Sequence, residues 1–273
     1  MADFHFKRKY IQVISALLFN ANFKGFAKGE IYQGDIKGVC VPGLNCYSCP
    51  GAIGACPLGS FQNAISTSNK KIPFYIVGTL LLFGVLFGRF ICGFLCPFGL
   101  IQELLYKIPS PKIKKNRITK VLSKLKYIIL VVIAVVFSFL FKEPAFCKWI
   151  CPAGTLEGGI PLTASNESIA AMTGVLFNWK VSLLVVILIG AIFIFRDFCR
   201  FICPLGAIYA FFNKVAIFGV RVDEGKCIHC GKCVRECKMD VHHVGDKECI
   251  QCGECKGICP TGAIISKRIK GDE

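Results

Sequence analysis

Uncharged apolar runs recur along the chain and alternate with segments rich in lysine and arginine. Four such runs are 14 to 17 residues long: Tyr10–Phe23, Ile72–Gly88, Tyr127–Phe141 and Val181–Phe195. A helix that crosses the lipid core needs about 20 apolar residues. Basic side chains at the ends of these runs can reach the membrane interface, which lets each helix extend beyond its uncharged core. The pattern predicts an α-helical membrane protein with about four transmembrane helices.

Composition agrees with a membrane protein, because 54% of the 273 residues are hydrophobic and 18% are charged. Four buried helices of a soluble bundle are the alternative, but such helices normally show a polar face. The first run also resembles a signal peptide, because it follows the basic segment Lys7–Lys9. No clear small-x-small cleavage site follows it, so we expect a retained anchor.

The net charge of +16 is distributed unevenly along the chain. Residues 1–219 carry 23 lysines and arginines against 8 acidic residues, whereas residues 220–273 carry 10 against 9. The densest basic run, Lys107–Lys126, lies between two predicted spans. Positively charged loops stay in the cytoplasm, so we expect both termini there, in a multi-pass protein of the cell membrane. The segments Lys24–Lys71 and Lys142–Lys180 should face outward. A nucleic-acid partner is not expected, because the basic run joins two spans.

The C-terminal segment contains the spacing C-x2-C-x2-C-x3-C twice. In bacterial two-cluster ferredoxins this spacing binds two [4Fe–4S] clusters, and the fourth cysteine of each copy ligates the other cluster. One cluster is therefore assigned to Cys227, Cys230, Cys233 and Cys259, and the second to Cys249, Cys252, Cys255 and Cys237. Paired zinc sites are the alternative, but zinc does not require this spacing of cysteines. We expect residues 220–273 to form a cytoplasmic α+β two-cluster ferredoxin-like domain, and residues 1–219 a transmembrane iron–sulfur domain.

The pattern C-P-x-G occurs five times, beginning at Cys56, Cys96, Cys151, Cys203 and Cys259. Proline fixes φ and lacks a donor, and the glycine two residues later permits a tight backbone path. Such a turn can direct peptide N–H groups toward the sulfur atoms of an anionic cluster. The three of these cysteines that follow apolar runs, Cys96, Cys151 and Cys203, also close a C-x3-C pair, whose two thiols share one helical face. One pair supplies two ligands, so two pairs complete a [4Fe–4S] site.

The predicted topology decides which pairs can meet. An inner membrane [4Fe–4S] cluster is expected where the second and fourth spans end, on Cys92, Cys96, Cys199 and Cys203. An outer membrane [4Fe–4S] cluster is expected on Cys49, Cys56, Cys147 and Cys151, with Cys46 as the alternative to Cys49. Disulfide bonds are the competing interpretation of either group, more so outside, where conditions can be oxidising. Cys40 has no assigned role.

The motifs ICGFLCPFG from Ile91, CRFICPLGAIYAF from Cys199 and the double C-terminal spacing together resemble the membrane polyferredoxin family, over about residues 72–265. This family includes NapH-type quinol dehydrogenase subunits and the iron–sulfur part of NosR-type proteins. The resemblance implies a membrane electron-transfer subunit with its ferredoxin domain in the cytoplasm. The cysteines between residues 46 and 56, together with Cys147 and Cys151, depart from the simplest members and support one further cluster. Lys238 stands where two-cluster ferredoxins usually have proline.

Four [4Fe–4S] clusters in this arrangement predict an electron-transfer subunit of a membrane redox complex, in contact with lipid and without substrate chemistry of its own. Its expected partners are a cytoplasmic donor, such as a ferredoxin or a flavoprotein, and an extracytoplasmic redox or flavin protein. No histidine lies in a predicted span, and neither C-x2-C-H nor G-x-G-x-x-G after a strand occurs, so haem and Rossmann cofactors are not expected. A quinone oxidoreductase subunit and a redox-sensing or assembly protein are the alternatives. The sequence does not determine the donor, the acceptor or the direction of electron flow.

Overall fold

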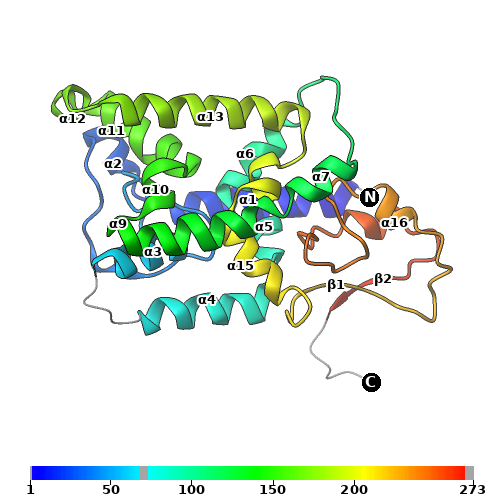
Figure 1. Cartoon of the computed structure of the whole chain (residues 1–273). Coiled ribbons are helices and arrows are strands. Elements are labelled where there is room, and N and C mark those ends of the chain that lie inside the picture. The colour runs from blue at the N-terminus through cyan, green and yellow to red at the C-terminus, as the bar shows by residue number, and fades with distance from the viewer. Residues whose placement is uncertain (1, 68–72, 268–273) are drawn as a thin grey trace.

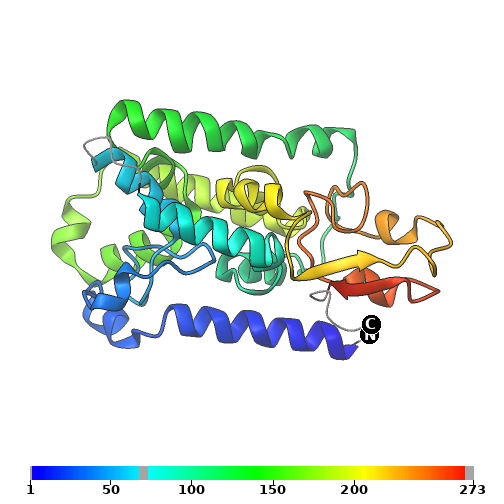
Figure 2. The same ribbon diagram turned by 90° about the horizontal axis from the view of Figure 1, so that it is seen from below.

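A bundle of four long helices, which lie side by side in two perpendicular views, dominates the computed structural model (Figures 1 and 2). The structure describes residues 2–67 and 73–267. The long helices are α1 (Ala2–Phe19), α4 (Phe74–Phe87), α13 (Val175–Phe193) and a continuous helix over Arg117–Phe141. Each overlaps one of the four apolar runs. Ile72, the expected start of the second run, lies outside the described residues.

The continuous helix Arg117–Phe141 joins the basic segment to the third apolar run. Its consecutive parts are α7 (Arg117–Leu122), α8 (Leu125–Ile128), the π-helix η2 (Ile129–Phe137) and α9 (Ser138–Phe141). It begins with a capping box, in which the Thr119 N–H donates to Asn116 Oδ1 at 2.9 Å and the Asn116 N–H donates to the Thr119 hydroxyl at 3.0 Å. It ends at Lys142, whose φ of 52° is left-handed and cannot continue the helix.

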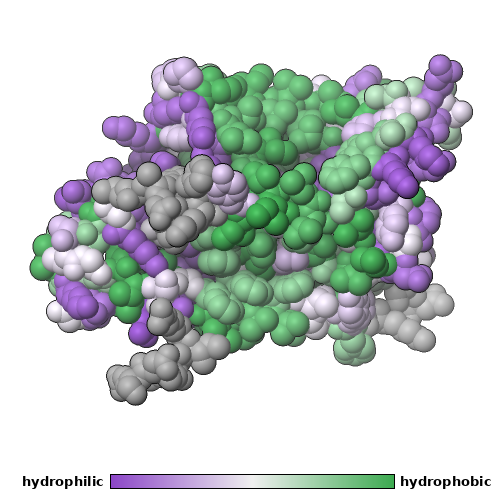
Figure 3. Space-filling model, turned by 180° about the vertical axis from the view of Figure 1, so that it is seen from behind, coloured by the Kyte–Doolittle hydropathy of each residue, from purple (hydrophilic) through white to green (hydrophobic). Residues whose placement is uncertain are grey.

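Apolar side chains cover the outside of the bundle. Within the described residues, two helices are long and apolar enough to cross a membrane: Arg117–Phe141, with 25 residues, and α13, with 19. Helix α4 is apolar but has 14 residues. Leu18 on α1, Leu82 on α4, Val131 on η2 and Val186 on α13 are all exposed. Figure 3 shows an apolar face between two hydrophilic ends. Such a surface belongs to a protein whose solvent is lipid, so the chain is a membrane protein.

Short helices lie at both ends of the bundle. At the end where α9 stops are α2 (Phe23–Lys28), η1 (Asp35–Gly38), α3 (Pro57–Thr67), α10 (Ala145–Trp149), η3 (Gly154–Gly159), α11 (Ile160–Ser165) and α12 (Glu167–Ala171). Toward the other end are α5 (Phe90–Phe94), α6 (Pro97–Leu105), α14 (Asp197–Phe201) and α15 (Pro204–Phe212). Among them, α5, α10 and α14 carry the first cysteine of a C-x3-C pair, and α3, α6 and α15 begin at the proline of a C-P-x-G turn.

The C-terminal segment forms a lobe at one end of the bundle (Figure 1). Its antiparallel strands β1 (Gly219–Val222) and β2 (Ile264–Lys267) pair Gly219 with Lys267 and Val222 with Ile264. Between the strands lie α16 (Lys232–Arg235) and the 3-10 helix η4 (Glu254–Gly257). The two-stranded sheet therefore ties together the start and the end of the segment that carries eight cysteines.

One structural unit occurs three times in the helical part of the chain. A five-residue helix (α5, α10 or α14) carries the first cysteine of a C-x3-C pair. The second cysteine directly precedes a proline with which the next helical segment begins. Helices α4 and α13 deliver two of these units to one end of the bundle, and the helix Arg117–Phe141 delivers the third to the opposite end.

Candidate metal centres

In two of the five C-P-x-G turns the glycine N–H donates a hydrogen bond to the cysteine sulfur. The N–H groups of Gly206 and Gly154 donate to the sulfurs of Cys203 and Cys151, each at 3.4 Å. In the turns of Cys56, Cys96 and Cys259 the glycine N–H acts to lower the pKa of the thiol. Because proline starts a helical segment in four of the turns, the sulfur lies where a helix presents unpaired N–H groups. Peptide N–H groups are thus directed toward the cysteine sulfur in the turns of Cys151 and Cys203, and their direction toward a cluster stays a prediction.

The structure brings together the cysteines expected at the inner cluster, which we call the inner group: Cys92, Cys96, Cys199 and Cys203. The other three thiols lie close enough to Cys203 that a negative charge on any of them raises the pKa of Cys203. Two of them, Cys92 and Cys96, raise the pKa of Cys199 in the same way. All four are buried. Burial raises the pKa of Cys96 to about 11 and that of Cys199 to about 12. A thiolate at these positions therefore needs a cationic partner, which ligated iron provides.

Buried donors surround the inner group. Gln102 Nε2 donates to Cys199 Sγ at 3.0 Å. Charge interactions link Arg196 with three of the four thiols, and Arg89 with Cys92. Both arginines are fully buried, and Nε of Arg89 has no hydrogen-bond partner among the described residues. Four thiols among buried cations and a free N–H group fit an anionic [4Fe–4S] cluster, because a buried donor is costly unless something accepts from it.

A second set of four cysteines, which we call the outer group, meets at the opposite end of the bundle: Cys46, Cys56, Cys147 and Cys151. The other three thiols lie close enough to Cys147 that a negative charge on any of them raises the pKa of Cys147. Two of them, Cys46 and Cys56, raise the pKa of Cys151 in the same way. Glycines border this group: a Cβ at Gly158 would lie 3.3 Å from Cys46 Sγ, and one at Gly59 would lie 3.6 Å from Cys147 Sγ. Glycine at these two positions therefore lets the backbone approach the thiols closely.

Cys46 rather than Cys49 joins the outer group. The Cys46 N–H donates to Glu157 Oε2 at 3.0 Å, which fixes its loop against η3. The Cys49 thiol instead donates to Asn20 Oδ1 at 3.5 Å, at the end of α1. The sequence favoured Cys49 because a proline follows it. The contacts support the alternative, and we therefore propose Cys46 as the fourth ligand of the outer group.

The C-terminal cysteines line two hollows. The first hollow, which we call the distal hollow, is lined by Cys227, Cys230, Cys233 and Cys259. The second, the proximal hollow, is lined by Cys237, Cys249, Cys252 and Cys255, with Cys233 at its edge. Cys259 thus lines a hollow with the cysteines of the first motif and Cys237 lines one with those of the second, and the exchange of ligands between two clusters stays a prediction. His229 and Gln251 occupy equivalent places in the two loops, and both have a left-handed φ, 51° and 56°, so the two loops repeat one backbone path.

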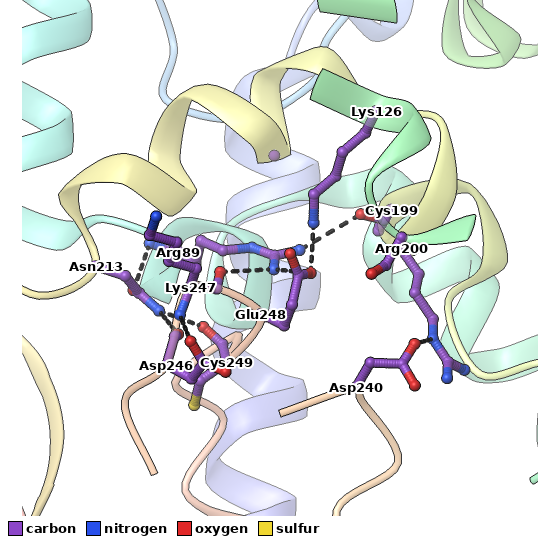
Figure 4. A network of polar contacts seen from close by, with 12 residues as sticks. Arg89, Lys126, Cys199, Arg200, Asn213, Asp240, Asp246, Lys247, Glu248 and Cys249 are labelled. Carbon is purple, nitrogen blue, oxygen red and sulfur yellow. Dashed lines mark hydrogen bonds and ion pairs between the residues drawn. The ribbon is translucent and has the colours of Figure 1, made fainter. Parts of the chain in front are cut away.

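Ion pairs attach the C-terminal lobe to the bundle beside the inner group (Figure 4). Arg89 Nη1 lies 2.9 Å from Glu248 Oε2, and Lys126 contacts the same carboxylate. Arg200 pairs with Asp240, and both side chains are about 1% exposed. Because these charges satisfy one another out of water, the lobe is held in one orientation.

Sequence reasoning missed this polar network. Its acidic residues, Glu248 and Asp240, lie in the lobe. Its basic residues lie beside or within a C-x3-C motif, or in the basic segment. The signal that was available is the arginine three residues before the first cysteine in two motifs, Arg89 and Arg196. Arg196 pairs with Glu103 on α6 at 2.7 Å, and Glu103 also pairs with Arg8 on α1 at 2.8 Å.

Cys40 stays outside all four cysteine sets. It is buried, and its backbone forms a parallel bridge with Ala55. Burial raises the pKa of its thiol, and the side chains of Ser60 and Thr79 partly offset this rise. All eighteen cysteines of the chain carry free thiols in the structure. The inner and outer groups lie among lipid-facing helices, and the lobe has two hollows lined by cysteines. Together these features define the class of membrane iron–sulfur proteins of ferredoxin type.

Comparison with known families agrees with this class. A model described as a 4Fe-4S binding domain matches residues 54–75, 72–116, 126–160 and 177–222, and a second model with the same description matches residues 220–242. These matches cover more than half of the chain, which therefore belongs to the 4Fe-4S binding domain family and, within it, to the membrane polyferredoxins of NosR and NapH type. Three of the four matches in the helical part each contain one C-x3-C-P unit.

Curated relatives extend the comparison. An uncharacterized protein of Methanocaldococcus jannaschii is 29% identical over 71% of this chain and 76% of its own length. The regulatory protein NosR of Pseudomonas aeruginosa is 30% identical over 58% of this chain, and the match covers 21% of the length of NosR. The methylamine utilization ferredoxin-type protein MauN of Methylobacillus flagellatus is 25% identical over 59% of this chain and 53% of its own length. No solved structure matches. The chain thus has an iron–sulfur electron-transfer role.

Proposed function

We propose that the chain conducts electrons across the cell membrane through four [4Fe–4S] clusters. The observation that carries this proposal is the separation of the inner and outer groups at opposite ends of the helix bundle. When bound, the clusters supply the redox-active iron, and the thiols of this chain hold them at fixed positions. Two hollows in the C-terminal lobe continue the series on the side of the inner group.

We further propose four spans with both termini in the cytoplasm. Contacts between the basic segment and the lobe support this orientation. Lys115 Nζ donates to the carbonyl of Cys237 at 3.0 Å, and Lys126 pairs with Glu248. The basic segment and the lobe therefore lie on the same side, which the positive-inside rule makes cytoplasmic. The outer group then faces the exterior.

The short helix α4 suits this role. Its 14 residues span about 21 Å at 1.5 Å per residue, less than the hydrocarbon core of a bilayer. Cysteine groups recessed into both ends of the bundle are closer together than the two membrane surfaces. A thin protein core of this kind shortens the distance over which an electron must be transferred.

Two redox partners complete the proposal. Cys230, at the distal hollow, is exposed to solvent, so a cytoplasmic ferredoxin or flavoprotein can approach the cluster that it would hold. An extracytoplasmic redox or flavin protein would exchange electrons with the outer group. The chain would then work as one subunit of a membrane redox complex.

Iron content and directional transfer test the proposal. Purified protein should contain about 16 iron atoms per chain, whereas about 8 would leave only the pair of clusters in the lobe. The double substitution Cys147→Ser and Cys151→Ser should remove about four of these irons and stop electron transfer from a cytoplasmic donor to an external acceptor in proteoliposomes. Cys40→Ser, at a buried cysteine outside the four sets, is the matched control.

Quinone chemistry is the outcome that would replace this proposal. If the double variant still reduced or oxidised menaquinone analogues at the unmodified rate, electrons would stop within the bilayer. The outer group would then have no part in turnover, and the chain would be a quinone oxidoreductase subunit.

A further inference from the structure

We infer that Gly93 is a positioning residue for electron transfer between the lobe and the helix bundle. Without a side chain at this position, the Cys252 loop of the lobe can rest directly on the helix that carries Cys92. The inference rests on the proposed function, because it concerns the contact between two of the four proposed clusters.

The contact at Gly93 is made by backbone atoms. Gly93 follows Cys92 on α5, and a Cβ built on it would overlap the carbonyl oxygen of Ile250. The same Cβ would lie 3.8 Å from Cys252 Cα. Ile250 is buried, so its loop has no room to retreat without disturbing the packing around it. Any larger residue at position 93 must push the loop of Cys252 away from the inner group.

The other two C-x3-C motifs carry long basic side chains at the equivalent position. Lys148 follows Cys147 and pairs with Glu143, and Arg200 follows Cys199 and pairs with Asp240 of the lobe. Two of the three motifs contact the lobe, Arg200 through its side chain and Gly93 through backbone atoms. Glycine therefore occurs at the motif on which the backbone of the lobe rests directly, and not because the cysteine turn itself needs it.

The surrounding contacts identify which hollow faces the bundle. Lys115 donates to the carbonyl of Cys237, and Asn213 Nδ2 donates to the carbonyl of Cys249 at 2.7 Å. Together with Cys252, these cysteines line the proximal hollow. Cys230 of the distal hollow is exposed instead. The order of centres is therefore distal hollow, proximal hollow, inner group and outer group.

When bound, the clusters held by the proximal hollow and by the inner group would exchange one electron at this contact, so that one would be oxidised as the other is reduced and no bond would break. The cytoplasmic ferredoxin or flavoprotein named above would be the external redox partner on the side of the lobe.

Spin coupling between reduced clusters tests the inference in the full-length protein. Gly93→Ala and Gly93→Val should keep about 16 iron atoms per chain. The broadening that the inner cluster imposes on the electron paramagnetic resonance signal of the lobe clusters should weaken in Gly93→Ala and be lost in Gly93→Val. Gly78→Ala is the matched control, because a Cβ there meets no atom within 4 Å. Unchanged broadening in Gly93→Val would overturn the inference.

A second variant keeps the test decisive if valine disturbs folding. Cys203→Ser removes a ligand of the inner group, and the same broadening should then disappear from the signal of the lobe. If the broadening persists without the inner cluster, the proximal cluster is not its neighbour and the inference is wrong. Failure of the proposed function would be visible earlier, as about 8 iron atoms in the unmodified chain.

Discussion

Arg89 and Glu248 join the helix bundle to the C-terminal lobe through an ion pair of 2.9 Å, although 159 residues separate them in the sequence. Arg89 precedes the first cysteine of the inner group by three positions, and Glu248 immediately precedes Cys249 of the proximal hollow. One buried pair therefore holds two proposed clusters next to each other. The first prediction follows from this position.

Arg89→Met removes the guanidinium and leaves Glu248 with Lys126 as its ionic partner. We expect a loss of about 3 kcal/mol in the stability of the docked lobe, because the Glu248 carboxylate loses one of its two buried cationic partners. The measurement is thermal unfolding of the purified protein, with proteolysis of the lobe as a second readout. Lys148→Met, at an ion pair whose side chains are 40% and 42% exposed, is the control and should cost at most about 1 kcal/mol. Equal effects of the two substitutions would contradict the prediction.

Cys46→Ser and Cys49→Ser distinguish the two candidates for the outer group. Cys46→Ser should lower the iron content by about four atoms per chain, because a [4Fe–4S] cluster needs four protein ligands. Cys49→Ser should retain the iron, since the Cys49 thiol is directed at Asn20. Iron analysis combined with the absorbance of the clusters is sufficient. Loss of iron in Cys49→Ser alone would reverse the assignment.

Gln102→Leu removes the amide that donates to Cys199 Sγ at 3.0 Å. Hydrogen bonds to cluster sulfurs favour the reduced state, which carries more negative charge. The reduction potential of the inner cluster should therefore become more negative in a redox titration. Gln62→Leu is a matched control at the opposite end, because Gln62 accepts from the Cys147 N–H and donates to the Ala134 carbonyl. A potential that moves equally in both variants would show that the effect is not local.

Gly84→Ala and Gly78→Ala compare two glycines of the same helix. A Cβ at Gly84 would lie 2.6 Å from the Phe212 ring of α15, whereas one at Gly78 meets nothing within 4 Å. Overpacking should make Gly84→Ala less stable by about 1–3 kcal/mol. Gly78→Ala should be neutral or stabilising by about 1 kcal/mol, since alanine favours helix. Thermal unfolding midpoints measure both, and a destabilised Gly78→Ala would contradict the packing of α4.

The sequence predicts the elements of this fold better than it predicts their contacts. Apolar runs without charge mark the four long helices, because lipid-facing and buried helices tolerate no exposed charge. The inner group was predicted because helices that run in alternate directions place Cys92 and Cys199 at the same end. The choice between Cys46 and Cys49 was not predictable in this way. It depends on Glu157, which is 111 residues from Cys46 and holds its loop.

The pairing of charges in the polar network of the lobe was equally inaccessible to sequence reasoning. A pair such as Arg200 and Asp240 has no fixed spacing and no periodicity, so it forms only after the lobe has docked. Nothing in the sequence marks Gly93, and its role is visible only in the fold, where the carbonyl of Ile250 lies against it. Local patterns predict local geometry, whereas contacts between distant segments need the assembled fold.

Each membrane cysteine group receives two helix N-termini, those after Cys96 and Cys203 on one side and those after Cys56 and Cys151 on the other. A helix N-terminus carries about half a positive charge, formed by rigid peptide dipoles. Dipoles that are already aligned do not reorient when a charge arrives. Proline turns at these cysteines therefore place aligned dipoles beside the thiols, and a cluster held there would accept an electron with a small reorganisation energy.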